Sequence, residues 1–275
     1  MNRENRKFQV AAVQMDCVRY QKAANLKTAE ALVGEAAQGG AKIIALPELF
    51  NTGYCVADAD FTLAEPIPTG ETTLWMESLC KQYGVFLTGA IIERDSHEGV
   101  LYDTHLLVGP EGYVGKYRKV CLWGDEQLRF REGSAYPVFD LGFAKVGLQI
   151  CYEVGFPESA RILALRGANL LIYSAAFGRA RSYVWELASR ARALENGVYV
   201  LAANRYGTEN DTLAFANKSR IISPRGDLLA EGEKRDTVLL AEIDLDQVPC
   251  QRRAVPYLRD YKQQLFAREI AGSDL

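Results

Sequence analysis

Three side chains that could carry out nucleophilic catalysis lie at the ends of predicted strands far apart in the chain. Cys151 follows a strand expected at 144–150, in LQICYEVGFPE, and Glu48 follows one expected at 42–46, in LPELF. Lys119 ends a predicted hairpin strand, in GKYRKVCLW. A thiol with a pKa of about 8.5 is mostly protonated at neutral pH, so it needs a base or a cation to become a good nucleophile. The pattern indicates a cysteine nucleophile assisted by a carboxylate and an ammonium.

Each of these residues is suited to a distinct chemical role. Burial raises the pKa of a carboxylate toward neutral pH, which suits Glu48 to take the thiol proton. Lys119 is suited to stabilise a thiolate or an oxyanion in a dry pocket. The sharp strand-to-helix step at Cys151 allows the next backbone N–H, that of Tyr152, to donate to the same oxyanion. Taken singly, each feature also has a structural explanation, since buried cysteines and capping glutamates are common.

The other cysteines and the two histidines leave two rival interpretations open. The six cysteines include no C-x-x-C pair, so neither a zinc knuckle nor a disulfide framework is predicted. Cys121 is a second thiol near the proposed site, but Cys151 is preferred because its turn supplies the oxyanion donor. A Cys–His protease or thioesterase would need His97 or His105 beside Cys151. Two histidines are too few for a three-histidine metal site.

Hydrophobic periodicity predicts an alternating α/β protein in which these residues follow strands. Strands are expected at 7–15, 42–46, 85–93, 101–108, 113–118, 144–150, 169–173 and 198–203, and a hairpin turn at 223–226. Helices are expected at 23–38, 72–83, 157–166 and 182–196. Functional residues gather beyond the carboxyl ends of such strands, which is where Glu48 and Cys151 lie.

Short segments in the two halves of the chain have similar sequences, which suggests a weak internal repeat. The matching segments are GGAKIIALPELF at 39–50 with RGANLLIYSAAF at 166–177, and VAAVQM at 10–15 with KVGLQI at 145–150. Each half is expected to form β-α-β-α-β-β with one sheet. No Pro/Ser-rich linker separates the halves, so residues 1–275 are expected to form one domain with two sheets packed face to face. A chance likeness between α/β segments remains the alternative.

The composition is that of an ordinary globular protein. Apolar residues make up 48% and charged residues 24%, and 32 basic against 35 acidic residues give a net charge of −3. A chain this close to neutrality has no overall field that attracts nucleic acid or an anionic membrane. No apolar run reaches the roughly 18 residues of a spanning helix. Because MNRENRKFQVAAVQM also lacks the pattern of a signal peptide, we expect a cytoplasmic protein.

The three motifs together resemble those of the nitrilase superfamily of carbon–nitrogen hydrolases. The likeness runs from VAAVQM to VPYLRDY and includes YDTHLLVGPEGYVGKYRK, FREGSAYPVFDLGFAKVGLQICYE, RARALENGVYVLAANRYG and SRIISPRGDLLAE. It implies a triad of Glu48, Lys119 and Cys151, a supporting Glu126, and no metal or organic cofactor. It also implies an αββα sandwich of two mixed sheets flanked by helices that associates into αββα–αββα dimers.

The resemblance implies hydrolysis of a small carboxamide through a thioester on Cys151, with release of ammonia. An N-carbamoyl amine or amino acid, or a nitrile, is an alternative substrate, and a non-catalytic binding protein of the same fold is a further possibility. Tyr152 stands where true nitrilases commonly have Trp, which argues against a nitrile. Cys121 and Glu153 depart from the His and Asp that many family members have at these positions.

The sequence also contains candidate residues for the walls of a substrate pocket. The aromatic candidates are Tyr54, Trp123, Phe156 and Phe177, although core packing explains aromatic residues equally well. Some family members place basic residues just after the nucleophile to bind a substrate carboxylate, whereas this chain has Val154, Gly155 and Phe156 there. The alternative cations are Arg179, Arg181 and Arg205, each of which could simply be a solvated surface charge.

Two segments are candidates for contacts between subunits. The amphipathic stretch RSYVWELASRARALEN at 181–196 could form a dimer face, or its apolar side could simply cover a sheet. The tail VPYLRDYKQQLF at 255–266 resembles family tails that cross between subunits. We therefore expect a homodimer or a higher homo-oligomer, with residues 250–275 as a C-terminal arm at the interface.

Overall fold

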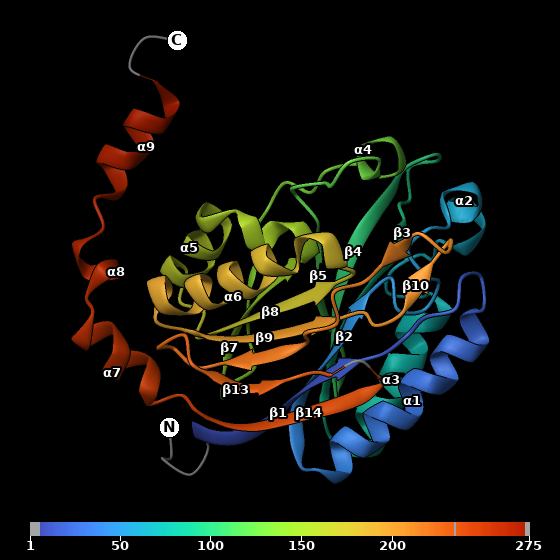
Figure 1. Ribbon diagram of the computed structural model, residues 1–275, viewed down its shortest axis with the longest axis horizontal. Helices are drawn as coiled ribbons and strands as arrows, with labels where there is room; N and C mark the ends of the chain where they lie inside the picture. Colours follow the sequence, from blue (N-terminus) through green and yellow to red (C-terminus); the bar gives the residue numbers. More distant parts are fainter. Residues whose placement is uncertain (1–5, 234, 273–275) are drawn as a thin grey trace.

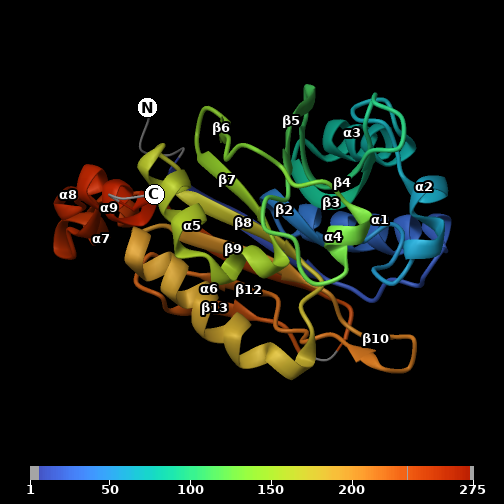
Figure 2. The ribbon, with the colours of Figure 1, turned by 90° about the horizontal axis from the view of Figure 1, so that it is seen from above.

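Two six-stranded sheets pack face to face between two layers of helices (Figures 1 and 2). This arrangement is seen in a computed structural model that describes residues 6–233 and 235–272. It confirms the predicted sandwich of two mixed sheets flanked by helices. None of the helices in those ranges combines the length and the apolar character needed to cross a membrane.

The first sheet carries the strand that ends at Glu48. Its strands, in spatial order, are β14 (Thr237–Asp244), β1 (Lys7–Gln14), β2 (Ala41–Glu48), β3 (Phe86–Arg94), β4 (Leu101–Gly109) and β5 (Gly112–Arg118). Strands β1, β2 and β3 are parallel, while β14, β4 and β5 are antiparallel to their neighbours. Both faces of β2 are covered, which explains its continuous apolar run.

The second sheet carries the strand that leads into Cys151. Its strands, in spatial order, are β13 (Leu228–Glu231), β12 (Arg220–Ile222), β9 (Tyr199–Asn204), β8 (Leu170–Ala175), β7 (Lys145–Ile150) and β6 (Val138–Asp140). Strands β7, β8 and β9 are parallel and the other three are antiparallel to their neighbours. The sheets meet where β1 and β2 pack against β8 and β9.

Helices cover the outer face of each sheet and exclude solvent from the central strands. The long helices α1 (Lys22–Gln38) and α3 (Glu71–Tyr83) pack on the first sheet, whereas α5 (Pro157–Leu165) and α6 (Ser182–Asn196) pack on the second. Gly197, with φ of +55°, ends α6 in the left-handed conformation that glycine adopts readily. All four helices lie within a residue or so of the predicted ranges.

The structure supports the repeat that the sequence suggested. The order β1-β2-β3-β4-β5 in the first sheet matches β7-β8-β9-β12-β13 in the second. Strand β14 was not predicted, because it follows the second half in sequence but joins the first sheet. It pairs with β1 along the whole length of that strand and so occupies the place that β6 has beside β7.

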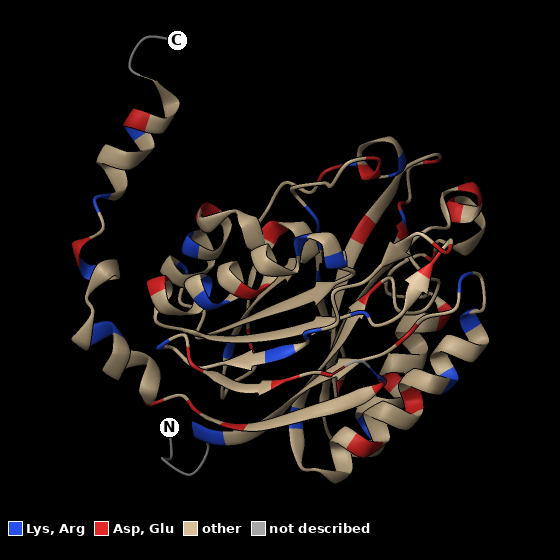
Figure 3. Cartoon of the chain, in the orientation of Figure 1, with Lys and Arg blue, Asp and Glu red and all other residues tan. Residues whose placement is uncertain are grey.

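Several short elements were also absent from the sequence prediction. They are the helical turns η2 (Ala57–Ala59), α2 (Asp60–Leu63), α4 (Glu126–Arg129), η3 (Cys151–Gly155) and η4 (Arg179–Arg181), the hairpin β10 (Thr208–Glu209) and β11 (Leu213–Ala214), and the terminal helices α7 (Gln247–Ala254), α8 (Tyr257–Asp260) and α9 (Gln263–Ala271). Figure 1 shows that α9 extends away from the sandwich, whereas α8 still contacts α6. Both basic and acidic residues occur on each of the two helix layers (Figure 3), in keeping with the small net charge.

Candidate active site

The three side chains that the sequence singled out meet between the two sheets. Lys119 follows β5, and its Nζ lies 2.6 Å from Oε1 of Glu48, the last residue of β2. The same Nζ is 2.8 Å from Oε2 of Glu126 and 3.4 Å from Oδ2 of Asp103. Cys151 begins η3, and its thiol lies against the Glu48 carboxylate. All of these side chains are buried.

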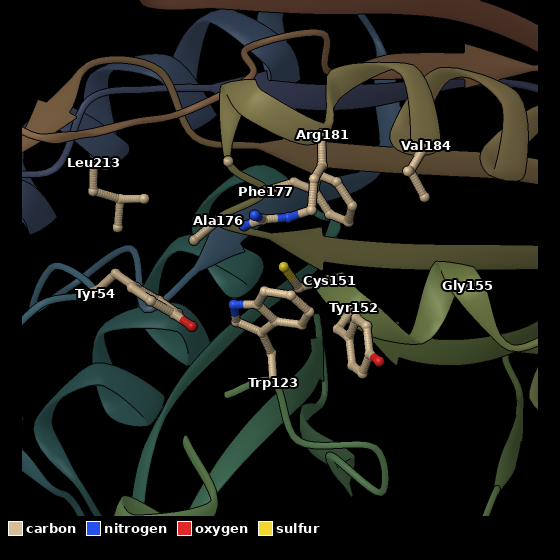
Figure 4. A pocket seen from close by; sticks show the side chains of 11 residues that line it. Tyr54, Trp123, Cys151, Tyr152, Gly155, Ala176, Phe177, Arg181, Val184 and Leu213 are labelled. Atoms are coloured by element: carbon tan, nitrogen blue, oxygen red, sulfur yellow. The ribbon is translucent and has the colours of Figure 1, made fainter. Parts of the chain in front are cut away.

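Cys151 occupies a strained turn. Its φ is +46°, a left-handed conformation that is costly for a residue other than glycine and that clusters at functional sites. The turn directs the sulfur out of β7 and into a cavity (Figure 4). The backbone N–H of Ala176, just after β8, donates to Oε2 of Glu48 at 2.7 Å and also contacts the Cys151 sulfur. The two sheets therefore orient the thiol and the carboxylate together.

The electrostatics leave the carboxylate ionised and the thiol protonated. Burial opposes ionisation of Glu48, but Lys119 and several hydrogen bonds outweigh it and hold the pKa of Glu48 below its ordinary value. The sequence-based expectation that burial would raise this pKa toward neutral pH is therefore wrong, because it did not include the Lys119 charge. Burial, and then the nearby Glu48 charge, raise the pKa of Cys151 well above the ordinary range. Although burial disfavours its charge, the surrounding carboxylates raise the pKa of Lys119 well above the usual range. The site thus pairs a proton acceptor with a thiol that holds a proton.

Sequence reasoning missed one carboxyl group of this cluster, Asp103. It lies on β4, is 1% exposed, and accepts the backbone N–H of Lys119 on its carbonyl oxygen at 2.9 Å. Burial raises the pKa of Asp103 well above its ordinary value. Oxygens of Glu48, Asp103 and Glu126 lie within 4.8 Å of one another, and the Lys119 ammonium is bonded to all three groups. The polar run YDT inside an apolar strand was the only available signal for Asp103.

The Cys151 sulfur opens into a small cavity of about 160 Å³ (Figure 4). Its lining comprises Tyr54, Trp123, Cys151, Tyr152, Gly155, Ala176, Phe177, Gly178, Arg181, Val184 and Leu213. Three of the four predicted aromatic residues are among them. The fourth, Phe156, packs edge-on against the Tyr152 ring at 5.1 Å, so it supports the wall from behind.

Tyr54 and Trp123 connect the cavity to the charged cluster. The Tyr54 hydroxyl donates to Oε1 of Glu126 at 2.6 Å, and the backbone N–H of Trp123 donates to Oε2 of Glu126 at 2.8 Å. Glu126 therefore holds two pocket walls as well as the Lys119 ammonium. A second, wider hollow of about 490 Å³ shares Tyr54 and Trp123 with the first.

Neither histidine is placed to activate Cys151. His105 is buried on β4, where its ring contacts Thr88 at 2.6 Å, Ser174 at 2.9 Å and the Gln149 carbonyl at 3.1 Å. Burial lowers its pKa to about 3, so its ring is neutral. His97 is exposed beside Asp95. Within the described ranges, the Cys–His alternative is therefore not supported by the geometry.

Cys121 lies outside the residues described as lining the cavity, in a loop that Glu153 organises. The Glu153 carboxylate accepts the backbone N–H groups of Val120 at 3.0 Å, Cys121 at 3.2 Å and Ile150 at 2.8 Å. Burial raises the pKa of the Cys121 thiol. The longer acidic side chain at 153 thus ties the segment after Lys119 to the end of β7.

The three candidate arginines lie in different surroundings. Arg205 is fully buried and pairs with Glu209, while its Nη2 donates to the Cys17 carbonyl at 2.6 Å. Arg179 is exposed and lines a separate surface hollow. Arg181, on the same turn η4, lines the cavity beside Cys151. Only the tertiary structure separates these three alternatives.

The comparisons with known proteins agree with this geometry. A profile of the carbon–nitrogen hydrolase family matches residues 9–253. The chain is 42% identical over 243 residues to a protein named nitrilase from Pyrococcus abyssi, covering 86% of this chain and 89% of that one. It is 33% identical over 274 residues to the omega-amidase NIT2 of Homo sapiens, covering 96% and 98%.

Solved structures show the same architecture. The Nit3 protein of Saccharomyces cerevisiae, a member of branch 10 of the nitrilase superfamily, superposes with a TM-score of 0.87 at 28% identity, covering 94% of this chain and 97% of that one. An amidase of the nitrilase superfamily from Nesterenkonia gives a TM-score of 0.83 at 25% identity, covering 94% and 96%. The chain therefore belongs to the nitrilase superfamily of carbon–nitrogen hydrolases, enzymes that act on amides.

Proposed function

We propose that the protein hydrolyses a small linear carboxamide through a covalent thioester on Cys151 and releases ammonia. The observation that carries this proposal is the buried contact of Glu48 with both Lys119 and the Cys151 thiol at the floor of a small cavity. An ionised carboxylate next to a protonated thiol can accept its proton as the sulfur attacks. The general reaction, hydrolysis of an amide, follows from the family.

Acylation begins when Glu48 takes the thiol proton and the sulfur bonds to the amide carbon. The Lys119 ammonium and the backbone N–H of Tyr152 stabilise the negative charge that develops on the carbonyl oxygen. Removal of one such donor costs about 3 kcal/mol in other enzymes. The carbon–nitrogen bond then breaks, Glu48 returns the proton to the nitrogen, and ammonia leaves a thioester on Cys151.

Deacylation uses the same carboxylate on water. Glu48 takes a proton from water while the oxygen attacks the thioester carbon. The carbon–sulfur bond breaks, Glu48 passes the proton to the sulfur, and the carboxylic acid product leaves. Glu126 keeps the Lys119 ammonium in place, as its 2.8 Å contact supports. Every proton in this cycle moves through residues of the chain, so the cycle needs no cofactor.

Carbamoyl amines and nitriles could react with the same nucleophile and are the alternative substrates. Several relatives are named omega-amidases, which supports an amide, whereas one relative is named nitrilase. Tyr152 beside the nucleophile also favours an amide over a nitrile. A purely binding protein is disfavoured because the buried charge cluster costs desolvation that a simple pocket would not need.

An ammonia-release assay over amides, carbamoyl amines and nitriles tests the proposal. Cys151→Ala is expected to abolish release, and Cys121→Ala, a matched thiol outside the described cavity lining, is expected to retain it. Brief mixing of the wild type with a good substrate, followed by acid quench, should give a mass increase on the peptide that contains Cys151. Equal activity of the wild type and Cys151→Ala would refute the mechanism.

A further inference from the structure

A buried histidine, His105, connects the two sheets next to the active site. It is fully buried on β4 of the first sheet. The residues around it in the layer between the sheets are apolar and include Ala90, opposite it on β3, and Leu107, two positions along β4. An imidazole in such surroundings costs free energy unless its nitrogens are hydrogen-bonded. Neither nitrogen takes part in the proposed proton transfers, so the partners of the ring indicate what it contributes.

The partners of His105 fix which ring nitrogen carries the hydrogen. Nδ1 lies 3.1 Å from the carbonyl oxygen of Gln149 on β7, and because a carbonyl oxygen can only accept, Nδ1 is the donor. Burial lowers the pKa of His105 to about 3, so the ring is neutral and Nε2 is an acceptor. Nε2 faces the hydroxyl groups of Thr88 at 2.6 Å and Ser174, on β8, at 2.9 Å. One ring of the first sheet therefore contacts two strands of the second.

Both of these strands reach the active site two residues beyond their contact with the ring. On β7, Gln149 lies two positions before Cys151. On β8, Ser174 lies two positions before Ala176, whose backbone N–H donates to Oε2 of Glu48 at 2.7 Å. The ring thus holds the segments that present the nucleophile and the backbone donor to its base.

The strand that carries the base belongs to the same network. The Ser174 hydroxyl donates to the carbonyl oxygen of Leu46 at 2.7 Å, and Leu46 lies two positions before Glu48 on β2. The hydrogen bonds around His105 therefore join β2, β7 and β8 just before each of them ends at the site. A fully satisfied buried network of this kind fixes one arrangement of the elements that it joins.

We propose that His105 is a positioning residue for the nucleophile, and that its ring holds the ends of β7 and β8 against β2 so that the Cys151 thiol stays within reach of the Glu48 carboxylate. This inference rests on the proposed roles of Cys151 and Glu48 and adds the residue that orients them. The backbone of Cys151 needs such support, because its φ of +46° is strained. Strained turns persist only where the surrounding structure holds them.

Three substitutions separate the parts of this network. His105→Leu removes both ring nitrogens and keeps an apolar side chain in the layer between the sheets. His105→Asn places an amide donor near the position of Nδ1, so it can still bond to the Gln149 carbonyl. Ser174→Ala keeps the ring and removes the hydroxyl that connects Nε2 to β2.

Tyr199→Phe is the matched control, because it removes a buried hydrogen bond between the sheets far from the site. The Tyr199 hydroxyl joins β9 to β14 by bonding to the backbone N–H and carbonyl of Asp244, each at 3.1 Å. In the parallel register of β7, β8 and β9, Tyr199 is aligned with Leu170 and Val146. It therefore lies at the end of these strands opposite to Cys151.

The test measures the geometry of the thiol apart from amide hydrolysis. Iodoacetamide alkylates a thiol with loss of iodide, and Glu48 takes the thiol proton, so the reaction needs the same thiol–carboxylate contact. Its rate is followed by the mass of the peptide that contains Cys151. In parallel, kcat and KM are measured for the best substrate of the ammonia-release assay, and urea titrations report the stability of each variant.

His105→Leu should slow both the alkylation of Cys151 and kcat by about 10- to 100-fold, while KM changes by less than about threefold, because the buried Gln149 carbonyl loses its donor. His105→Asn should stay within about fivefold of the wild type, since the donor is kept. Ser174→Ala should lose about 3- to 10-fold in both rates. Tyr199→Phe should lose stability without a change in either rate.

Ser174→Ala keeps the test decisive if His105→Leu does not fold. Alkylation and kcat equal to those of Tyr199→Phe in the foldable variants, or an asparagine variant as slow as the leucine variant, would overturn the proposal. If the wild type hydrolyses no amide while alkylation of Cys151 depends on His105, the proposed function fails and the positioning role stands. If hydrolysis occurs and neither rate depends on His105, the positioning role fails alone.

Discussion

The chemistry at the residue scale depends on how three buried carboxyl groups share one ammonium. Glu48, Asp103 and Glu126 all contact Lys119, so full ionisation would leave a net negative charge in a dry site. Asp103 also contacts Glu48, and two carboxyl groups in contact share a proton. Burial raises the pKa of Asp103, whereas Lys119 helps to hold that of Glu48 below its ordinary value, so the proton resides on Asp103.

The pH profile tests this assignment. Activity requires an ionised Glu48, and its depressed pKa keeps it ionised at any pH above its ordinary pKa of 4.5. Activity also requires a charged Lys119, and its raised pKa keeps it charged at any pH below its ordinary pKa of 10.5. We expect kcat/KM to be level from about pH 6 to 9 at constant ionic strength. His105, with a pKa of about 3, adds no step in this range. A step near pH 6.5 would contradict the assignment, since it would indicate a catalytic histidine.

Substitution of Asp103 tests where the proton lies. Asparagine keeps a hydrogen-bond donor of the same shape, so Asp103→Asn should keep kcat/KM at pH 7 within about threefold of the wild type. Asp103→Ala removes the donor to the charged Glu48 and should cost about 1.5–3 kcal/mol, or roughly 10- to 100-fold in kcat/KM. If the asparagine variant is as damaged as the alanine variant, an ionised Asp103 is required instead.

At the scale of elements, the site depends on loops that are held by buried ion pairs. Glu209, on β10, accepts the backbone N–H of Tyr54 at 3.0 Å and that of Cys55 at 2.7 Å. The same carboxylate pairs with buried Arg205, which follows β9. The second half of the chain thereby positions Tyr54, which in turn donates to Glu126. The hydrogen bonds of Glu209 therefore hold the irregular loop that carries Tyr54 in place as a wall of the cavity.

Loss of Glu209 should therefore affect both stability and activity. Glu209→Ala leaves buried Arg205 with only the more exposed Asp16, 3.3 Å away, as a carboxylate partner. It should lower the free energy of unfolding by about 3 kcal/mol in urea titrations. Glu30→Ala, at an exposed position on α1, should stay within about 0.5 kcal/mol. A Glu209→Ala protein as stable as the control would show that the buried pair does not hold this loop.

At the scale of the whole molecule, the outer face of α6 and the helix α9 expose apolar side chains to solvent. On α6, Leu187 is 68% exposed and Tyr183 lies one turn before it, also exposed. On α9, Leu265, Phe266 and Ile270 are exposed on an element that extends away from the sandwich (Figure 1). Exposed apolar patches of this kind commonly mark interfaces. We propose that two copies associate through α6 and that the C-terminal arm lies at their interface.

Sedimentation measures this association directly. The wild type is expected to sediment as a dimer or larger oligomer at micromolar concentration, and Leu187→Asp should shift it toward the single chain of 30.6 kDa. Leu74→Asp is the matched control, because Leu74 is also exposed but lies on α3, over the other sheet. A wild type that sediments as one chain would refute the dimer.

The sequence alone determined the central strands, the four long helices and the types of reactive residue. Continuous apolar runs predicted the central strands because strands covered on both faces must be apolar throughout. Helix α6 begins and ends at its predicted residues, where its periodic pattern stops at Gly197. The motifs around Glu48, Lys119 and Cys151 identified residues that prove to meet between the sheets. These are local signals, which each segment carries regardless of its neighbours.

Only the tertiary structure decided which distant residues share a site. Lys119 bonds to Glu48, which is 71 positions away in the sequence, and no local pattern around either residue predicts that the two meet. In the sequence Asp103 is one polar residue in an apolar strand, and only the packing of β4 places it beside Lys119. For the same reason, the sequence did not predict strand β14 or the different surroundings of Arg179, Arg181 and Arg205. Burial and charge neighbours arise when segments pack, so they belong to the fold and not to any one stretch of the chain.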